Sequence, residues 1–231
     1  MTQRWKDLLF LHWRFEEGAI AKTLPEGLRV DTFDGSAWVG IVPFQMEKVR
    51  VLGFPLPGKR SAFPELNLRT YVRDWKDRPG VWFYSLDAGA PFAVWGARVF
   101  FHLNYKNARM SVSVVDDSIH YRSERRNRHT ENPIDEFIWR RPSEGLQTAR
   151  PETLEYFLLE RYRLFASNPR NEKLYTGTVS HEPYRFAPVT PDKWTAHLFP
   201  LNGFEPLERP PESCLASPGF PVRIHPLEKV S

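Results

Sequence analysis

Hydrophobic and polar residues alternate along much of the chain, and a period of two is the pattern of a β-strand with one buried face. Residues 5–15 illustrate it, with Leu9, Leu11, Trp13 and Phe15 in an alternating or doubly apolar segment. Further strands are predicted at 28–33, 36–46, 65–73, 81–87, 99–106, 110–116 and 119–125, near 173–181 and in the segment 222–227. The chain is therefore expected to consist mainly of strands.

Short polar turns separate several of these segments. Asp34-Gly35 is a strong hairpin signal between the strands predicted at 28–33 and 36–46. Asp77–Gly80 connects the next two strands, and Asp116-Asp117 connects a third pair. These positions predict antiparallel neighbours.

Helices are expected to be few and short. One is predicted over 16–24, where Pro25 ends it, and one or two helical turns over 90–98. Pro151 opens a third over 151–160. We expect less helix than the usual third of a globular protein.

One predicted strand has two apolar faces, since Trp38 and Val42 oppose Val39 and Ile41. Such a strand lies at the centre of a structure. No internal repeat and no Gly/Ser-rich linker divides the chain, so a single domain over residues 1–231 is expected. The predicted fold is mainly β (α+β), with a long antiparallel sheet that closes or folds on itself.

Composition excludes several protein classes. With 231 residues, 41% of them hydrophobic and 26% charged, the chain can bury a full core, so disorder and collagen-like repetition do not fit. The net charge of +4 is weak evidence for nucleic acid. The densest basic stretch could hold phosphate groups, but it lacks interleaved aromatic residues and reads more simply as a solvated hairpin or loop; it comprises His120, Arg122, Arg125, Arg126, Arg128 and His129.

The single cysteine, Cys214, allows neither an intramolecular disulfide nor a cysteine zinc site. No hydrophobic run is long enough to span a membrane, and the N-terminal segment carries charges that a signal peptide lacks. We therefore expect a cytoplasmic protein without membrane contacts. The seven histidines show no ligand spacing, and no metal site is predicted.

The segment FPELNLRTYV carries the most informative pattern. On a strand, Glu65, Asn67, Arg69 and Tyr71 share one face, while the residues between them form an apolar face. A half-exposed strand would look the same. Because the flanking segments are apolar on both faces, the polar face is interpreted as lining an internal cavity.

A second row of polar residues lies in RVFFHLNYKNARM. Tyr105 and Lys106 are neighbours on this strand, so only one of them can enter a given cavity. A lysine in an apolar pocket can form a Schiff base with a carbonyl compound, although a solvated surface lysine is the more common case.

Common catalytic motifs are missing from the sequence. It contains no G-x-x-x-x-G-K-[ST], G-x-G-x-x-G, H-E-x-x-H or G-x-S-x-G. No cofactor is therefore predicted.

The chain resembles the YqjF-like family of uncharacterised bacterial proteins. The matching segments, in order, are LPEGLRVDTFDGSAWVGIVPFQM, FPELNLRTYV, GVWFYSLDA, ARVFFHLNYKNARM, LEYFLLERYRLF and VSHEPY. This family is similar in pattern to acetoacetate decarboxylase, which implies a closed, strongly bent antiparallel β-barrel around a small-molecule cavity.

The resemblance also implies site residues. A substrate-facing glutamate of acetoacetate decarboxylase follows an aromatic-x pair, which Phe63-Pro64-Glu65 matches. Its Schiff-base lysine is the first of two adjacent lysines, and here Tyr105 stands in that place with Lys106 after it. The lysine pair that lowers the nucleophile's pKa is missing.

Three functions follow from these patterns. The first is a cavity for a small carboxylate or carbonyl compound, in which Asn67, Arg69, Tyr71 and Tyr105 bind the ligand and Glu65 acts as acid or base. The second is a Schiff-base lyase that uses Lys106. The third is a non-catalytic module whose basic patch at 122–129 engages an acidic partner. Whether chains assemble into a homo-oligomer is open.

Overall fold

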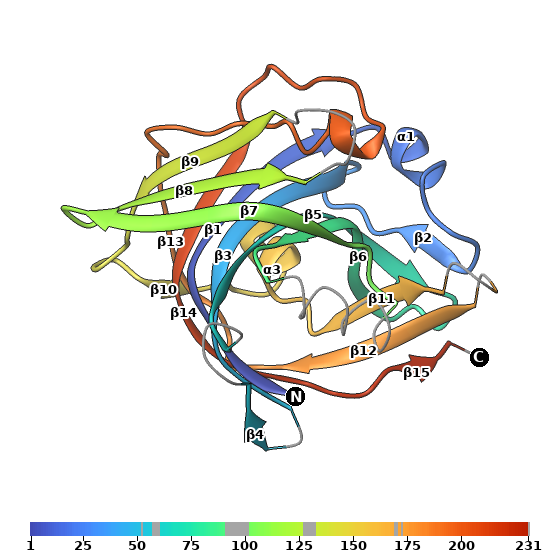
Figure 1. Cartoon of the computed structure of the whole chain (residues 1–231). Helices are drawn as coiled ribbons and strands as arrows, with labels where there is room; N and C mark the ends of the chain where they lie inside the picture. The colour runs from blue at the N-terminus through green and yellow to red at the C-terminus, as the bar shows by residue number, and fades with distance from the viewer. Residues whose placement is uncertain are drawn as a thin grey trace.

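In a computed structural model of the chain, long strands pair side by side in one sheet, and the sheet closes because strands at its two ends also pair (Figure 1). The structure describes residues 1–51, 53–56, 61–90, 102–126, 133–168, 171 and 173–230. Strands predominate among them and the helices are short, so the expected mainly β fold is confirmed.

A closed ring of strands forms the centre of this described part. Most neighbours in the ring are antiparallel, whereas the pair β11–β6 is parallel. Irregular registers in the β1–β3 and β5–β6 pairs bend the sheet, so the ring is not an even barrel. In order of pairing, the ring strands are β5 (Phe63–Asp74), β3 (Ala37–Val51), β1 (Thr2–Phe15), β14 (Ser213–Ile224), β12 (Leu174–Ser180), β11 (Arg163–Ser167) and β6 (Pro79–Ala88), which pairs with β5 again.

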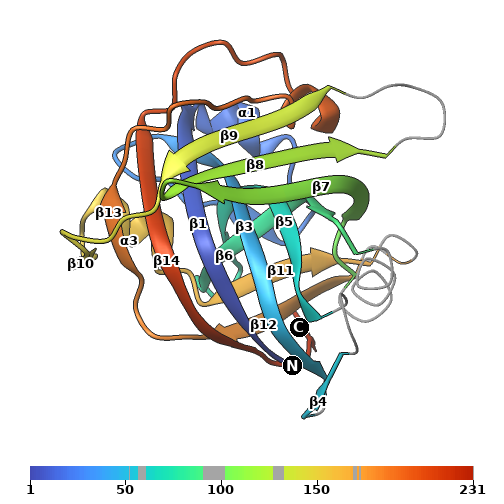
Figure 2. The same ribbon diagram turned by 60° about the vertical axis from the view of Figure 1, so that its left-hand side comes forward.

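Three further strands form an arm that continues the sheet from β6. They are β7 (Tyr105–Val115), β8 (Ser118–Arg125) and β9 (Ile134–Arg140). Figure 2 shows this arm crossing the outer face of the ring. Ile119 and Trp139 of the arm pack with Leu9 and Leu11 of β1 in one buried cluster. The outer faces of the central ring strands are thus covered.

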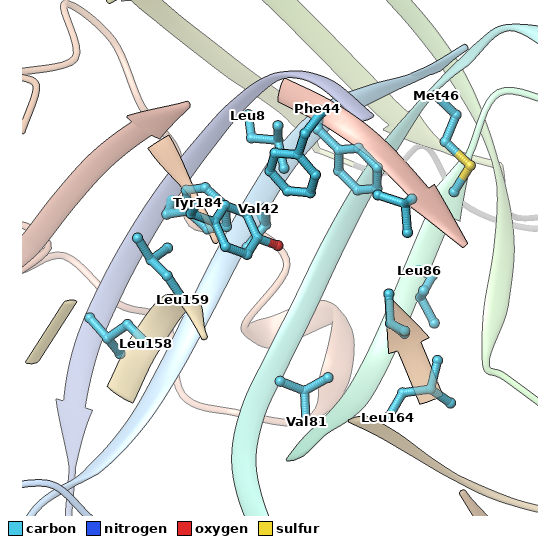
Figure 3. Close-up of a cluster of buried hydrophobic side chains, with 14 of the residues drawn as sticks. Leu8, Val42, Phe44, Met46, Val81, Leu86, Leu158, Leu159, Leu164 and Tyr184 are labelled. Carbon is cyan, nitrogen blue, oxygen red and sulfur yellow. The ribbon is translucent and has the colours of Figure 1, made fainter. Parts of the chain in front are cut away.

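The inner faces of the same strands form a second core. Leu8 of β1, Val42 and Phe44 of β3 and Leu86 of β6 belong to it (Figure 3). Because strand side chains alternate between two faces, β1 and β3 serve both cores and must be apolar on both sides. This confirms the interpretation of the strand that begins near residue 36.

The remaining elements are short and lie at the margins of the ring. They are α1 (Glu17–Ala21), β2 (Leu28–Val30), β4 (Phe54–Pro55), β10 (Gln147–Thr148), α3 (Leu154–Leu159), β13 (Arg185–Pro188), the 3₁₀ helix η2 (Pro200–Asn202) and β15 (Glu228–Lys229). Among the described residues no helix is both long and apolar enough to cross a membrane.

The predicted turns form, with one difference in pairing. Asp34 and Gly35 both have positive φ, +51° and +68°, as a type I′ turn requires, and Phe33 and Ser36 pair across it. However, β2 does not continue this hairpin with β3 and pairs with β5 instead. The Asp34-Gly35 signal therefore predicted the turn correctly, but it did not predict which strand β2 pairs with.

Two of the three predicted helices are observed, and the third lies almost entirely outside the described residues. The helix at 16–24 is observed over Glu17–Ala21. The third begins at Leu154 rather than Pro151, because Thr153 is its N-cap and accepts a hydrogen bond from the Tyr156 N–H. The helix predicted over 90–98 lies outside the described residues apart from Ala90, and the strand predicted at 99–106 lies partly outside them.

Gly40 of β3 leaves room for a buried histidine on the neighbouring strand. A Cβ on Gly40 would lie 2.6 Å from Cδ2 of His12. We predict that Gly40→Ala lowers the free energy of unfolding by about 1–3 kcal/mol, because neither strand can move without breaking ladder hydrogen bonds. Gly18→Ala is the matched control, since no atom lies within 4 Å of its added Cβ. Urea unfolding measures the free energy of unfolding of both variants. A Gly40→Ala variant as stable as the wild type would contradict the close contact.

Candidate functional site

A cavity lies inside the ring, and side chains from every ring strand contribute to its lining. The space open to the centre of a water molecule is about 60 Å³, so the cavity suits a compact ligand. Most of the lining is apolar, with Phe10, Val42, Phe44 and Leu86 as examples. Polar side chains come from several elements, with Glu65, Asn67 and Arg69 on β5 and Gln3 and Arg163 among the others.

The row predicted on β5 faces the interior. Glu65, Asn67, Arg69 and Tyr71 are only 2%, 5%, 7% and 0% exposed. The first three line the cavity. Tyr71 lies behind Arg69, within hydrogen-bond distance of it. The alternating residues of β5 pack into the outer core, which is why the strand presents its polar side to the inside.

Glu65 is held by neighbours that donate hydrogen bonds to it. The hydroxyl of Tyr105 donates to Oε2 at 2.8 Å, and Asn67 also hydrogen bonds to the carboxyl group. Burial outweighs these hydrogen bonds and raises the pKa of Glu65 to about 8. At neutral pH Glu65 is therefore a neutral acid with a proton to donate.

Arg69 is a buried cation without a carboxylate partner among the described residues. Its Nη2 donates to the Leu158 carbonyl at 3.1 Å and to the Tyr71 hydroxyl at 3.4 Å. The guanidinium carbon lies 5.5 Å from the ring centre of Phe10. Its Nε is buried and has no acceptor in the described chain. A buried charge in this state favours an anionic ligand, which would supply the missing countercharge.

His12 supports Arg69 from behind and was not predicted from the sequence. Its Nε2 lies 2.7 Å from the Tyr71 hydroxyl, which itself donates to the Leu158 carbonyl at 3.0 Å. With the hydroxyl proton donated to Leu158, the Tyr71 oxygen can accept a hydrogen bond from Nε2 in the tautomer that carries its hydrogen there. Burial and the nearby Arg69 lower the pKa of His12 well below its usual value, so the ring is neutral.

Arg161 is a second guanidinium in the cavity lining, and it is paired. Its Nη1 lies 2.6 Å from Oδ2 of Asp31, and its guanidinium carbon lies 4.2 Å from the ring centre of Phe157. The sequence offered no signal for this pair, because its members are far apart in the chain. Arg161 therefore has a carboxylate partner, which it shares with Arg73 at 2.8 Å, in contrast to Arg69. Arg163, a third guanidinium in the lining, donates to the Thr176 hydroxyl at 3.2 Å.

Of the two candidates at the start of β7, Tyr105 enters the cavity. Lys106 is half-buried, stands opposite Asp87 of β6 and is not part of the lining. The nearby charge of Lys106 favours the ionised form of Asp87, whose pKa is nevertheless raised, chiefly by burial. The structure thus brings together the β5 row and Tyr105, and leaves Lys106 on the other side of the strand.

The predicted basic patch at 122–129 is only partly a surface feature. Arg125 is buried and contacts Asp87 at 2.7 Å and the Ser85 hydroxyl at 2.7 Å. Arg122 lies 3.9 Å from Glu136. Residues 127–132 lie outside the described part. Within that part, no group of three or more His, Cys, Asp or Glu side chains is placed to hold a metal ion.

The raised pKa of Glu65 predicts a pH-dependent difference in stability. Between its usual pKa of 4.5 and the folded value of about 8, the folded chain holds a proton that the unfolded chain has lost. The contribution of Glu65 therefore falls as pH rises through this window, by up to about 5 kcal/mol in total.

Glu65→Gln retains the hydrogen-bond acceptor and removes the titration. Denaturant unfolding from pH 5 to pH 9 should show the variant gaining stability relative to the wild type as pH rises. A constant difference across this range would mean that Glu65 titrates as an ordinary, hydrated carboxylate.

Comparisons with known proteins agree with this architecture. The chain is 42% identical over 185 residues to the uncharacterized protein YqjF of Bacillus subtilis (strain 168), a match that covers 80% of this chain and 74% of YqjF. Acetoacetate decarboxylase from Legionella pneumophila has the same fold, with a TM-score of 0.63 at 12% identity, covering 100% of this chain and 88% of that one.

The enduracididine biosynthesis enzyme MppR, solved in complex with pyruvate, also shares the fold, with a TM-score of 0.64 at 12% identity over 100% of this chain and 90% of MppR. The resemblance to acetoacetate decarboxylase inferred from the sequence is confirmed at the level of the fold. The model of the DUF2071 family, described as an uncharacterized conserved protein, matches residues 2–221. The chain therefore belongs to the DUF2071 family.

Proposed function

We propose that the chain binds a small carboxylate or carbonyl compound in the ring cavity. The observation that carries this proposal is Arg69, a buried cation in the cavity lining with a free Nε–H and no carboxylate partner among the described residues. An incoming carboxylate would pair with the guanidinium group and satisfy its unused donor. The apolar walls would strengthen this pairing because they exclude water.

Each polar residue of the row has a role in this proposal. Arg69 binds the carboxylate. Glu65, neutral at pH 7, donates a hydrogen bond or a proton to a carbonyl oxygen of the ligand, while Tyr105 holds the acid in position. Asn67 offers its free Oδ1 as an acceptor, and Tyr71 orients Arg69. Proton donation to a carbonyl is the chemistry that such a site could perform.

The ligand of one structural neighbour supports this ligand class. MppR was solved with pyruvate, which combines a carboxylate and a carbonyl group. Pyruvate is thus a reasonable first probe for a cavity that presents a cation and a neutral acid.

The alternatives are less well supported. A Schiff-base lyase would need the amine of Lys106 in the cavity, and Tyr105 occupies that face of the strand. An interaction module that uses the patch at 122–129 could not use Arg125 to bind a partner, because this side chain is only 9% exposed and is paired with Asp87.

We predict that pyruvate binds and that the neutral analogue pyruvamide binds at least tenfold more weakly, since only the carboxylate pairs with Arg69. Arg69→Met should weaken pyruvate binding by roughly 10- to 100-fold, the range for a charged hydrogen bond. The matched control is Arg140→Met, on the exposed position of β9. Isothermal titration calorimetry measures both ligands against the wild type and the two variants.

Equal binding of pyruvate and pyruvamide by the wild type would contradict the proposal, and this comparison does not depend on the folding of any variant. The pH profile gives a second test. Pyruvate binding should weaken above pH 8, because ionised Glu65 would then repel the carboxylate. No such decline is expected in Glu65→Gln.

Lys106 is predicted not to form a Schiff base with acetoacetate. Its side chain lies outside the cavity lining, beside Asp87, so the bound carbonyl would be out of reach. Incubation with acetoacetate and borohydride, followed by peptide mass analysis, tests this. An adduct on the peptide that contains Lys106, absent from Lys106→Arg, would contradict this prediction and support the Schiff-base lyase.

A further inference from the structure

The N-terminal end of β1 places unsatisfied polar atoms in the same cavity. Gln3 is 4% exposed, and neither its amide nitrogen nor its amide oxygen has a hydrogen-bond partner in the described chain. The indole N–H of Trp5 is also buried without an acceptor. Both residues line the cavity. An unmet polar group loses its hydration without compensation, and native proteins nearly always satisfy such groups.

Strand registers give the order of these groups along the interior. On β3, Trp5 stands opposite Met46, Glu65 opposite Phe44, and Arg69 opposite Gly40. Trp5 is thus displaced from Glu65 by two residues, about 7 Å along the strand, in the direction away from Arg69. Gln3 lies farther still in that direction. A ligand with its carboxylate on Arg69 and its carbonyl at Glu65 would point its other end toward Gln3 and Trp5.

The surroundings of Gln3 and Trp5 suit an uncharged group. The Trp5 ring packs against Phe44 and Phe220 at centroid distances of 5.6 and 5.8 Å. His181 is 6.1 Å away, and burial lowers its pKa, so it adds no charge at neutral pH. The rings that pack on Trp5 carry no charge, so they would not compensate the lost hydration of a charged tail. An amide offers an acceptor and donors, the complement of what Gln3 and Trp5 present.

We propose that Gln3 and Trp5 form a specificity subsite for an uncharged polar group, such as a carboxamide, at the end of the ligand opposite its carboxylate. This inference rests on the proposed function, since it takes Arg69 as the carboxylate site. The subsite narrows the ligand class from any small carboxylate to a carboxylate that carries an uncharged polar group at its other end.

Two pairs of carboxylates test the subsite, each matched in shape. Arg69 and Trp5 are six residues apart in register, about 20 Å along the strand, so the probes must be long enough to approach both. Adipamate is compared with 6-methylheptanoate, and suberamate with 8-methylnonanoate, so that a branched alkyl group replaces the carboxamide at two chain lengths. In at least one pair the wild type should bind the amide at least tenfold more tightly, because the alkyl analogue leaves Gln3 and Trp5 unpaired. Calorimetric titration measures each affinity.

Gln3→Leu and Trp5→Phe should each reduce this preference, because each removes a polar group that would pair with the amide. Both variants should fold, since each replaces a side chain with an unsatisfied polar group by an apolar one. Arg69→Met should instead weaken both members of each pair.

The outcomes separate the two proposals. If the carboxylates bind through Arg69 but the amides show no preference, or keep it in Gln3→Leu and Trp5→Phe, the subsite is wrong and the proposed function stands. If no carboxylate binds the wild type, both proposals fail.

Discussion

The burial of β5 on both faces is the constraint on which the rest of the structure depends. Its outward residues, such as Leu66 and Leu68, anchor the outer core, and its inward residues are Glu65, Asn67 and Arg69. Inside the closed ring these polar groups are buried, with at most 7% of each residue exposed. Each must therefore change its ionisation state, find a partner within the ring, or await a ligand.

Glu65, Arg69 of the same row and the neighbouring His12 respond differently to burial. Glu65 keeps its proton, because burial raises its pKa to about 8. His12 loses its proton, because burial and Arg69 lower its pKa. Arg69 cannot lose its charge, because a guanidinium remains protonated in proteins. At neutral pH the row therefore presents one positive charge beside a neutral acid, an arrangement suited to a carboxylate ligand.

Local patterns in the sequence predicted much of this arrangement. Alternation placed Glu65, Asn67 and Arg69 on one face, and the two-sided apolar segment around Trp38 showed that neighbouring strands lie at the centre. Alternation also showed that Tyr105 and Lys106 could not both enter a cavity. What it could not show was contact between distant segments. The fit of His12 against Gly40, the pair of Arg161 with Asp31, the burial of Arg125 and the β2–β5 pairing all depend on tertiary structure.

The most direct test of this account is the ionisation of Glu65 itself. The side-chain carboxyl ¹³C signal of Glu65, assigned by its loss in Glu65→Gln, can be followed by NMR across the pH range. A titration midpoint near 8 is predicted, because burial inside the ring disfavours the carboxylate. A midpoint near the ordinary value of 4.5 would show that the β5 row is open to water, and would contradict the cavity on which both proposals rest.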